Sequence, residues 1–256
     1  MSRKFGTTIM VRGINAIPLL LGSLYLNLLL TLLPYLPSSI NEWYFSDITV
    51  GPIFSIVLLI FGIINIIIIV LLFVFTYNMR NESSAPEITR FCNLFFIALG
   101  IQVFIIFQSF IATHLIIDPV SNHDLYLTVS IIRTIIIDVI KTISFIFHFI
   151  AWNTFTQHYI NVQKQKIAKA SAIIRAGYVI LLVCNITKHI SHILLLLLFV
   201  FPGGFNFVNY AFPILFLIGE SGYLLIGSIV LIIGDIKLGN VLQQNFSQNS
   251  QQDLVH

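Results

Sequence analysis

The chain has 256 residues, of which 57% are hydrophobic and only 9% are charged, and its mean hydropathy is +0.96. Soluble domains carry about 25% charged residues, and disordered chains are polar, so this composition excludes both classes. The formal net charge of +3 is too small to indicate binding to nucleic acid. The composition therefore predicts an integral membrane protein built mostly of bilayer-spanning segments.

The N-terminal segment, residues 1–13, is basic and lacks the small-residue cleavage site of a secretory signal. The first apolar stretch is therefore predicted to be an uncleaved signal anchor. Thr7 and Thr8, between Arg3 and Arg12, are also similar to a mitochondrial transit peptide. The endomembrane system or the plasma membrane is the favoured location, and the mitochondrial inner membrane is the alternative.

Six stretches are long and apolar enough to cross a bilayer, which takes about 20 helical residues. They cover residues 14–36, 51–77, 91–117, 125–152, 172–201 and 211–234. We expect an all-α, polytopic protein with one six-helix transmembrane domain over 14–235. The residues that follow, 236–256, end in a tract rich in Gln, Asn and Ser and are expected to be a disordered tail.

Basic residues in the connecting segments predict the orientation of these helices. Ten Lys and Arg residues belong to the N-terminus, the second and fourth loops and the tail, and the first, third and fifth loops contain none. By the positive-inside rule, both termini are predicted on the cytoplasmic side, or on the matrix side in mitochondria. A seven-helix receptor would need another span or an outside N-terminus.

The fourth loop, 161–169, carries Lys164, Lys166 and Lys169. Such a cluster can attract anionic lipid headgroups, at about 1 kcal/mol per charge. The alternative is the ordinary positive-inside signal, which needs no bound lipid.

Five charged residues lie within the predicted spans and not in the loops: Arg133, Asp138, Lys141, Lys188 and Glu220. A charge at the bilayer centre costs about 2.5–3.5 kcal/mol on insertion scales, so these groups must pair or contact water. Counting the helical rise places Asp138 level with Lys188 and Arg133 level with Glu220, and leaves Lys141 beside Asp138. We expect these pairs to hold the last three spans together.

Polar residues of the fourth and fifth spans share helix faces. On the fourth span the face comprises Ser130, Arg133, Thr134, Asp138, Lys141, Ser144 and His148. On the fifth it comprises Tyr178, Asn185, Lys188, His189 and His192. A secondary polar layer is predicted to contain Asn65, Gln102, Gln108, His148 and Asn185. Polar side chains in membranes can also serve only to join helices, at about 0.6 kcal/mol each.

No cofactor is predicted. The histidines of the spans do not face one another at matching depths, as a haem would require. Cations in the same layer oppose a metal ion. Cys92 and Cys184 lie in apolar stretches and form neither a disulfide framework nor a zinc pattern. The histidines concerned are His114, His148, His189 and His192.

Short motifs are similar to those of the androgen-inducible six-pass lipid hydrolases. They include Trp43-Tyr44-Phe45 before the second span, Asn122-His123 before the fourth, Gly177-Tyr178 and Val183-Cys184 in the fifth, and Gly219-Glu220 in the sixth. That family places a Thr at the start of the second span and a His at the start of the fourth. Thr49 and His123 lie nearby, but their spacing departs from the family's pattern. The resemblance therefore implies a lipid hydrolase only as an alternative.

The favoured hypothesis is a membrane protein that moves a proton, an ion or a small polar solute. Its predicted pathway consists of Arg133, Asp138, Lys141, Lys188, His189, His192 and Glu220, with the two histidines as relays near neutral pH. The alternatives are a chemosensory-type receptor, a non-catalytic subunit of a larger membrane complex, and the lipid hydrolase. No catalytic residue is predicted. The expected partners are membrane lipids and further membrane subunits, identical or different, and not nucleic acid.

Overall fold

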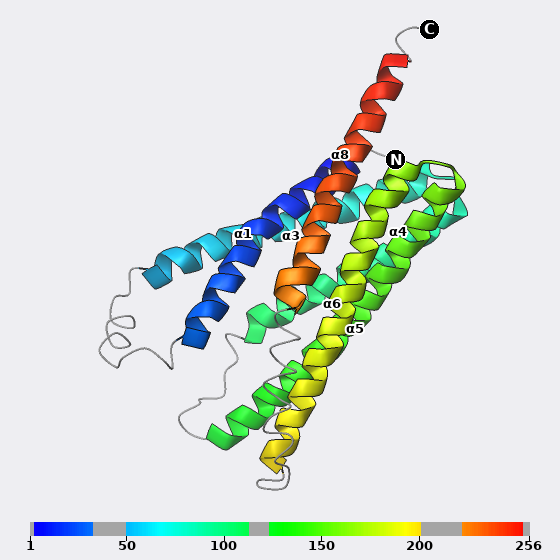
Figure 1. Ribbon diagram of the computed structural model, residues 1–256. Helices are drawn as coiled ribbons and strands as arrows, with labels where there is room; N and C mark the ends of the chain where they lie inside the picture. The colour runs from blue at the N-terminus through cyan, green and yellow to red at the C-terminus, as the bar shows by residue number, and fades with distance from the viewer. Residues whose placement is uncertain (1–2, 33–49, 113–122, 201–221, 253–256) are drawn as a thin grey trace.

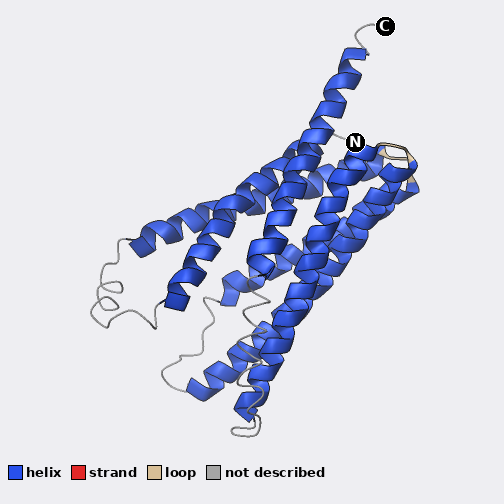
Figure 2. Ribbon diagram, viewed as in Figure 1, coloured by secondary structure: helices blue, strands red, loops and turns tan. Residues whose placement is uncertain are grey.

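The computed structural model describes residues 3–32, 50–112, 123–200 and 222–252, and among these residues it contains helices and no strand (Figures 1 and 2). A long α5 and a long α6 run side by side, and α8 lies between α1 and α6 (Figure 1). The helical elements are α1 (Arg3–Leu32), α3 (Val50–Glu82), α4 (Pro86–Ala112), α5 (His123–Asn161), α6 (Gln165–Val200), the short π-helix η2 (Gly222–Gly227) and α8 (Ser228–Gln252).

Five helical stretches of the described residues are long and apolar enough to cross a membrane. Their outer faces carry exposed aliphatic side chains, such as Ile63 and Ile67 of α3, each about half exposed. Such faces are favourable against lipid and unfavourable in water. The chain is thus a helical membrane protein with several spans, as its composition predicts. The five stretches are Ile60–Glu82, Pro86–Ile106, Ile132–Asn161, Gln165–Ser191 and Leu225–Gln244.

Helix α1 corresponds to the first of the six predicted spans, and the end of that span lies outside the described residues. The start of α1, the turn between α5 and α6, and the second half of α8 gather at one end of the bundle (Figure 1). The distribution of basic residues predicts this grouping. The side of the membrane that this end faces stays a prediction.

Two boundaries differ from the sequence prediction. Residues 1–13 were expected to flank the first span, but α1 begins at Arg3. Residues 236–256 were expected to be disordered, but α8 continues to Gln252. The physical reason is mutual packing, because the two helices run antiparallel and Leu242 of α8, whose side chain is buried, lies against Gly6 of α1. Tertiary contact of this kind stabilises a helix whose composition alone would not.

The core contains a cluster of aromatic rings near the turn between α5 and α6. Phe91 of α4 lies at its centre, with ring centroids 4.7 Å from Phe155 and 5.3 Å from Trp152 of α5. Phe5 of α1 adds an edge-to-face contact at 6.5 Å. These rings are fully buried, and they fix α1, α4 and α5 relative to one another at this end of the bundle.

Glycines allow α8 to approach both of its neighbours closely. A Cβ atom on Gly234 would lie 2.7 Å from the Ile174 side chain and 2.9 Å from the Ile174 nitrogen of α6. On Gly239 it would lie 2.5 Å from Met10 Cβ and 2.7 Å from the Gly6 carbonyl oxygen of α1. Only a residue without Cβ fits such contacts, which are common between membrane helices. The close approach brings polar side chains of α1 and α8 into direct contact.

Candidate functional site

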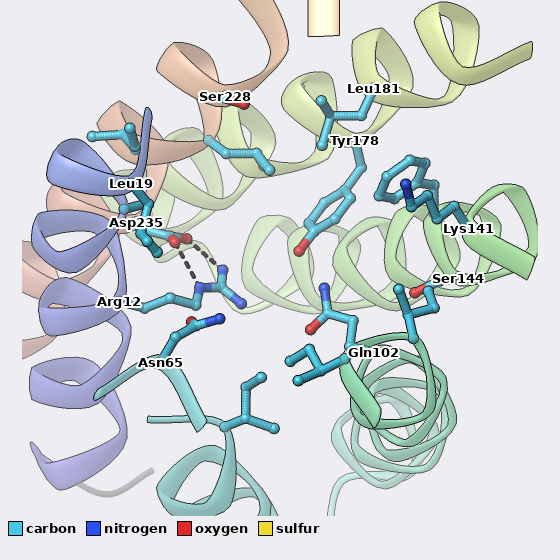
Figure 3. A pocket seen from close by; sticks show the side chains of 17 residues that line it. Arg12, Leu19, Asn65, Gln102, Lys141, Ser144, Tyr178, Leu181, Ser228 and Asp235 are labelled. Atoms are coloured by element: carbon cyan, nitrogen blue, oxygen red, sulfur yellow. Dashed lines mark hydrogen bonds and ion pairs between the residues drawn. The ribbon is translucent and has the colours of Figure 1, made fainter. Parts of the chain in front are cut away.

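A cavity of about 350 Å³ lies where six helices meet, namely α1, α3, α4, α5, α6 and α8 (Figure 3). Its volume is within the range of small-molecule sites, about 300–1,000 Å³. Aliphatic side chains form much of the wall, and eight polar or charged residues converge on the space. These eight residues are Arg12, Asn65, Gln102, Lys141, Ser144, Tyr178, Ser228 and Asp235.

One side of the cavity is formed by an ion pair between the first and last helices. Arg12 of α1 donates from Nε to Oδ2 of Asp235 of α8 at 2.7 Å, and from a terminal guanidinium nitrogen to Oδ1 at 2.6 Å. The side chains are only 14% and 5% exposed. This is the two-pronged geometry in which an arginine binds a carboxylate most strongly. The pair therefore joins α1 to α8 within the bundle.

Neither member of this pair was predicted as a site residue. Arg12 was assigned to the basic N-terminal segment, and Asp235 directly follows the last predicted span, 211–234. A signal for both was present in the sequence. The apolar pattern continues through Phe5 and Ile9 before Arg12 and through Leu238 beyond Asp235, and all three side chains are buried. That pattern would have extended both helices and moved the two charges inside them.

Amide and hydroxyl groups surround the guanidinium of Arg12. Asn65 of α3 and Gln102 of α4 point into the cavity, and the hydroxyl of Tyr178 points toward Arg12 (Figure 3). Lys141 lies on the opposite side, beside Tyr178 (Figure 3). Three residues that the sequence analysis selected, Asn65, Gln102 and Lys141, thus line one cavity.

Lys141 connects the cavity to a second polar cluster between α5 and α6. Its Nζ lies 3.9 Å from Oδ1 of Asp138, whose side chain is 1% exposed. Asn185 of α6 donates from Nδ2 to the Asp138 carbonyl oxygen and to Thr142 Oγ1, both at 2.8 Å. The contacts set α6 against α5 with Asn185 opposite Asp138. Lys188, which is partly buried, follows three residues later on α6.

His148 does not line the cavity itself but packs against Tyr178, which does. Its ring stacks on Tyr178 with centroids 4.4 Å apart and an interplanar angle of 17°. Its Nδ1 lies 2.9 Å from the Ser144 carbonyl oxygen, and because a carbonyl only accepts, Nδ1 carries the proton. Within the described part of the chain, Nε2 is buried and has no hydrogen-bond partner. The structure therefore assigns His148 a position that holds Tyr178 in place.

The remaining predicted residues do not line the cavity. Arg133 is exposed on α5, and His189 is partly buried on α6. Several predicted residues, or their side chains, lie outside the described structure. They are Glu220 and Thr49, and the side chains of Gln108, His123 and His192. The expected pair of Arg133 with Glu220 therefore also lies outside the described structure.

Among the described residues, no group of three or more His, Cys, Asp or Glu side chains could hold a metal ion. No protein family, curated protein or solved structure matches the chain. The function therefore has to be inferred from the cavity and its surroundings.

Proposed function

We propose that the protein transports a small polar solute or ion, and that the cavity between the six helices is its binding site. The observation that carries this proposal is the convergence of eight polar or charged residues on one space in a chain with only 9% charged residues. Polar groups inside a membrane protein are costly and typically belong to substrate or ion pathways. Helix interfaces within the membrane are where transporters bind their substrates.

The charges of the wall favour an anionic or zwitterionic solute. Arg12 and Lys141 contribute two positive charges and Asp235 one negative charge, so the residues that line the cavity carry an excess of one positive charge, while Asp138, 3.9 Å from Lys141, does not line it. Asn65, Gln102 and Tyr178 add hydrogen-bond donors around the same space. A carboxylate group of the solute would accept hydrogen bonds from several of these residues, and an ammonium group of a zwitterionic solute would contact Asp235.

A polar path beyond the cavity is consistent with this proposal. From Lys141, polar side chains continue along the interface of α5 and α6 through Asp138 and Asn185 toward Lys188 and His189. In this proposal a solute or proton leaves the cavity along these residues. Asp138 and Lys188 exchange charge, as the sequence-based hypothesis states, and His189 follows Lys188 on α6.

The test is flux through the purified protein in liposomes. A trapped pH-sensitive dye reports movement of protons, and radiolabelled succinate and glutamate report anionic and zwitterionic solutes. We expect uptake of at least one probe above that of empty liposomes. Lys141→Met should reduce this uptake about tenfold or more, because it removes the excess positive charge, and Lys141→Arg should restore most of it.

The variant Val179→Ala is the matched control, since Val179 is exposed on α6 beside Tyr178 in sequence and does not line the cavity. Its uptake should equal that of the unmodified protein. Uptake of every probe equal to that of empty liposomes would overturn transport of these solute classes. Saturable binding that depends on Lys141 but occurs without uptake would favour the receptor alternative.

A further inference from the structure

A second hollow lies on the surface of the bundle, away from the central cavity. It is a groove of about 340 Å³ between the first turns of α6 and the middle of α8. Three lysines line it, Lys166 and Lys169 from α6 and Lys237 from α8. All three are exposed. Two helices that are distant in the sequence thus direct positive charge to one place.

Among the residues that the structure describes, no carboxylate lines the groove, so none of them cancels the attraction for an anion. The ion pairs between described residues join other side chains, namely Arg12 with Asp235, Lys141 with Asp138 and His158 with Glu87. Lysine heads that converge without an acidic neighbour have strong affinity for phosphate oxygens. The groove therefore has the charge of an anion-binding site.

Three of the residues that line the groove are apolar. Ala170 is buried, and Ile173 and Val241 are partly buried, while Asn240 and Gln244 add amide groups to the lining. The groove lies at the end of the bundle that holds the start of α1 and the turn between α5 and α6 (Figure 1). From this end α6 and α8 continue as apolar membrane-crossing stretches. A ligand that fits has an anionic head and long apolar chains.

We propose that this groove binds an anionic phospholipid, with the headgroup phosphate between Lys166, Lys169 and Lys237 and the acyl chains along α6 and α8. Basic pockets between membrane helices bind anionic headgroups in this way. This proposal is independent of the transport function. The positive-inside signal alone would require basic residues on this side of the membrane, but it would not require them to converge on a groove from two helices.

The test is lipid binding to the full-length protein in detergent, measured by native mass spectrometry. The probes are phosphatidylglycerol and phosphatidylcholine with identical acyl chains. We expect phosphatidylglycerol to bind more tightly. Lys166→Gln, Lys169→Gln and Lys237→Gln should each weaken its binding about fivefold, which corresponds to the loss of one lysine–headgroup attraction. The triple variant should weaken it about a hundredfold and leave phosphatidylcholine unchanged.

Lys164→Gln is the matched control, because Lys164 is an exposed lysine directly before α6 that does not line the groove. It should weaken binding less than twofold. An equal effect of Lys164→Gln and Lys166→Gln would overturn the proposal in favour of general surface charge. Glycerol phosphate is added as a soluble competitor. If it binds as tightly as phosphatidylglycerol, the groove is a site for free phosphate esters, and the lipid proposal is wrong.

Discussion

The two ionic clusters on opposite sides of the cavity differ in their geometry. Arg12 and Asp235 join two helices through two short contacts of 2.6 and 2.7 Å. Lys141 and Asp138 belong to the same helix and are separated by 3.9 Å, and the Lys141 side chain is 30% exposed. Breaking either pair would leave a buried carboxylate, Asp235 or Asp138, without its cation. Lys141 is more exposed than Arg12 and makes one long contact in place of two short ones, so it is the less tightly held cation. We therefore call the Arg12–Asp235 side of the cavity the fixed wall, because two short contacts join its helices, and the Lys141 side the adjustable wall, because its cation is held less tightly.

The largest expected effect is the loss of one member of the fixed pair. Asp235→Leu or Arg12→Met should lower the free energy of unfolding by about 3–5 kcal/mol, because each leaves a buried charge uncompensated. The double variant should be much more stable than the sum of the two losses predicts. Unfolding in detergent, followed by circular dichroism, measures all three. Additive losses would show that the two side chains do not interact.

A smaller effect is expected where α8 and α1 are closest. Gly239→Ala should cost about 1–3 kcal/mol, because its Cβ would meet Met10 Cβ at 2.5 Å and the Gly6 carbonyl oxygen at 2.7 Å. Gly100→Ala is the control, since nothing lies within 4 Å of its added Cβ. This change should be neutral or stabilising by about 0.5–1 kcal/mol, as alanine is the better helix former. Equal costs at both positions would contradict the close packing of α1 and α8.

The smallest effect is expected on the adjustable side. Asn185→Leu removes two hydrogen bonds of 2.8 Å between α6 and α5. Hydrogen bonds between membrane helices are worth about 0.6 kcal/mol on average and at most about 1.7 kcal/mol, so the loss should fall in that range. The same unfolding assay measures it. A loss as large as that of Asp235→Leu would mean that the α5–α6 wall is as firmly fixed as the α1–α8 wall.

The sequence was sufficient to predict the helical membrane class, since long apolar runs leave no other arrangement that satisfies the backbone within lipid. It also selected Asn65, Gln102 and Lys141, because polar side chains stand out in such runs. It placed Tyr178 and Ser144 on the polar faces of their spans without marking them as site residues.

The sequence did not reveal the pair of Arg12 with Asp235. A basic residue near the start of an apolar stretch is normally counted as a loop charge, although Phe5 and Ile9 continue the apolar pattern of α1 before Arg12. Recognising the pair requires knowing that the first and last helices are neighbours. Contacts between residues 223 positions apart arise from the packing of the whole bundle and leave no mark on local composition. The depth matches of Asp138 with Lys188 and of Arg133 with Glu220 stay predictions.

The contact of α1 with α8 also has a consequence for biosynthesis. Ribosomes make chains from the N-terminus, so the guanidinium of Arg12 emerges long before the carboxylate that will neutralise it. Until α8 is inserted into the bilayer, water or lipid phosphate must solvate the charge of this arginine. The cavity wall that depends on this pair can therefore form only after α8 has been translated and inserted beside α1.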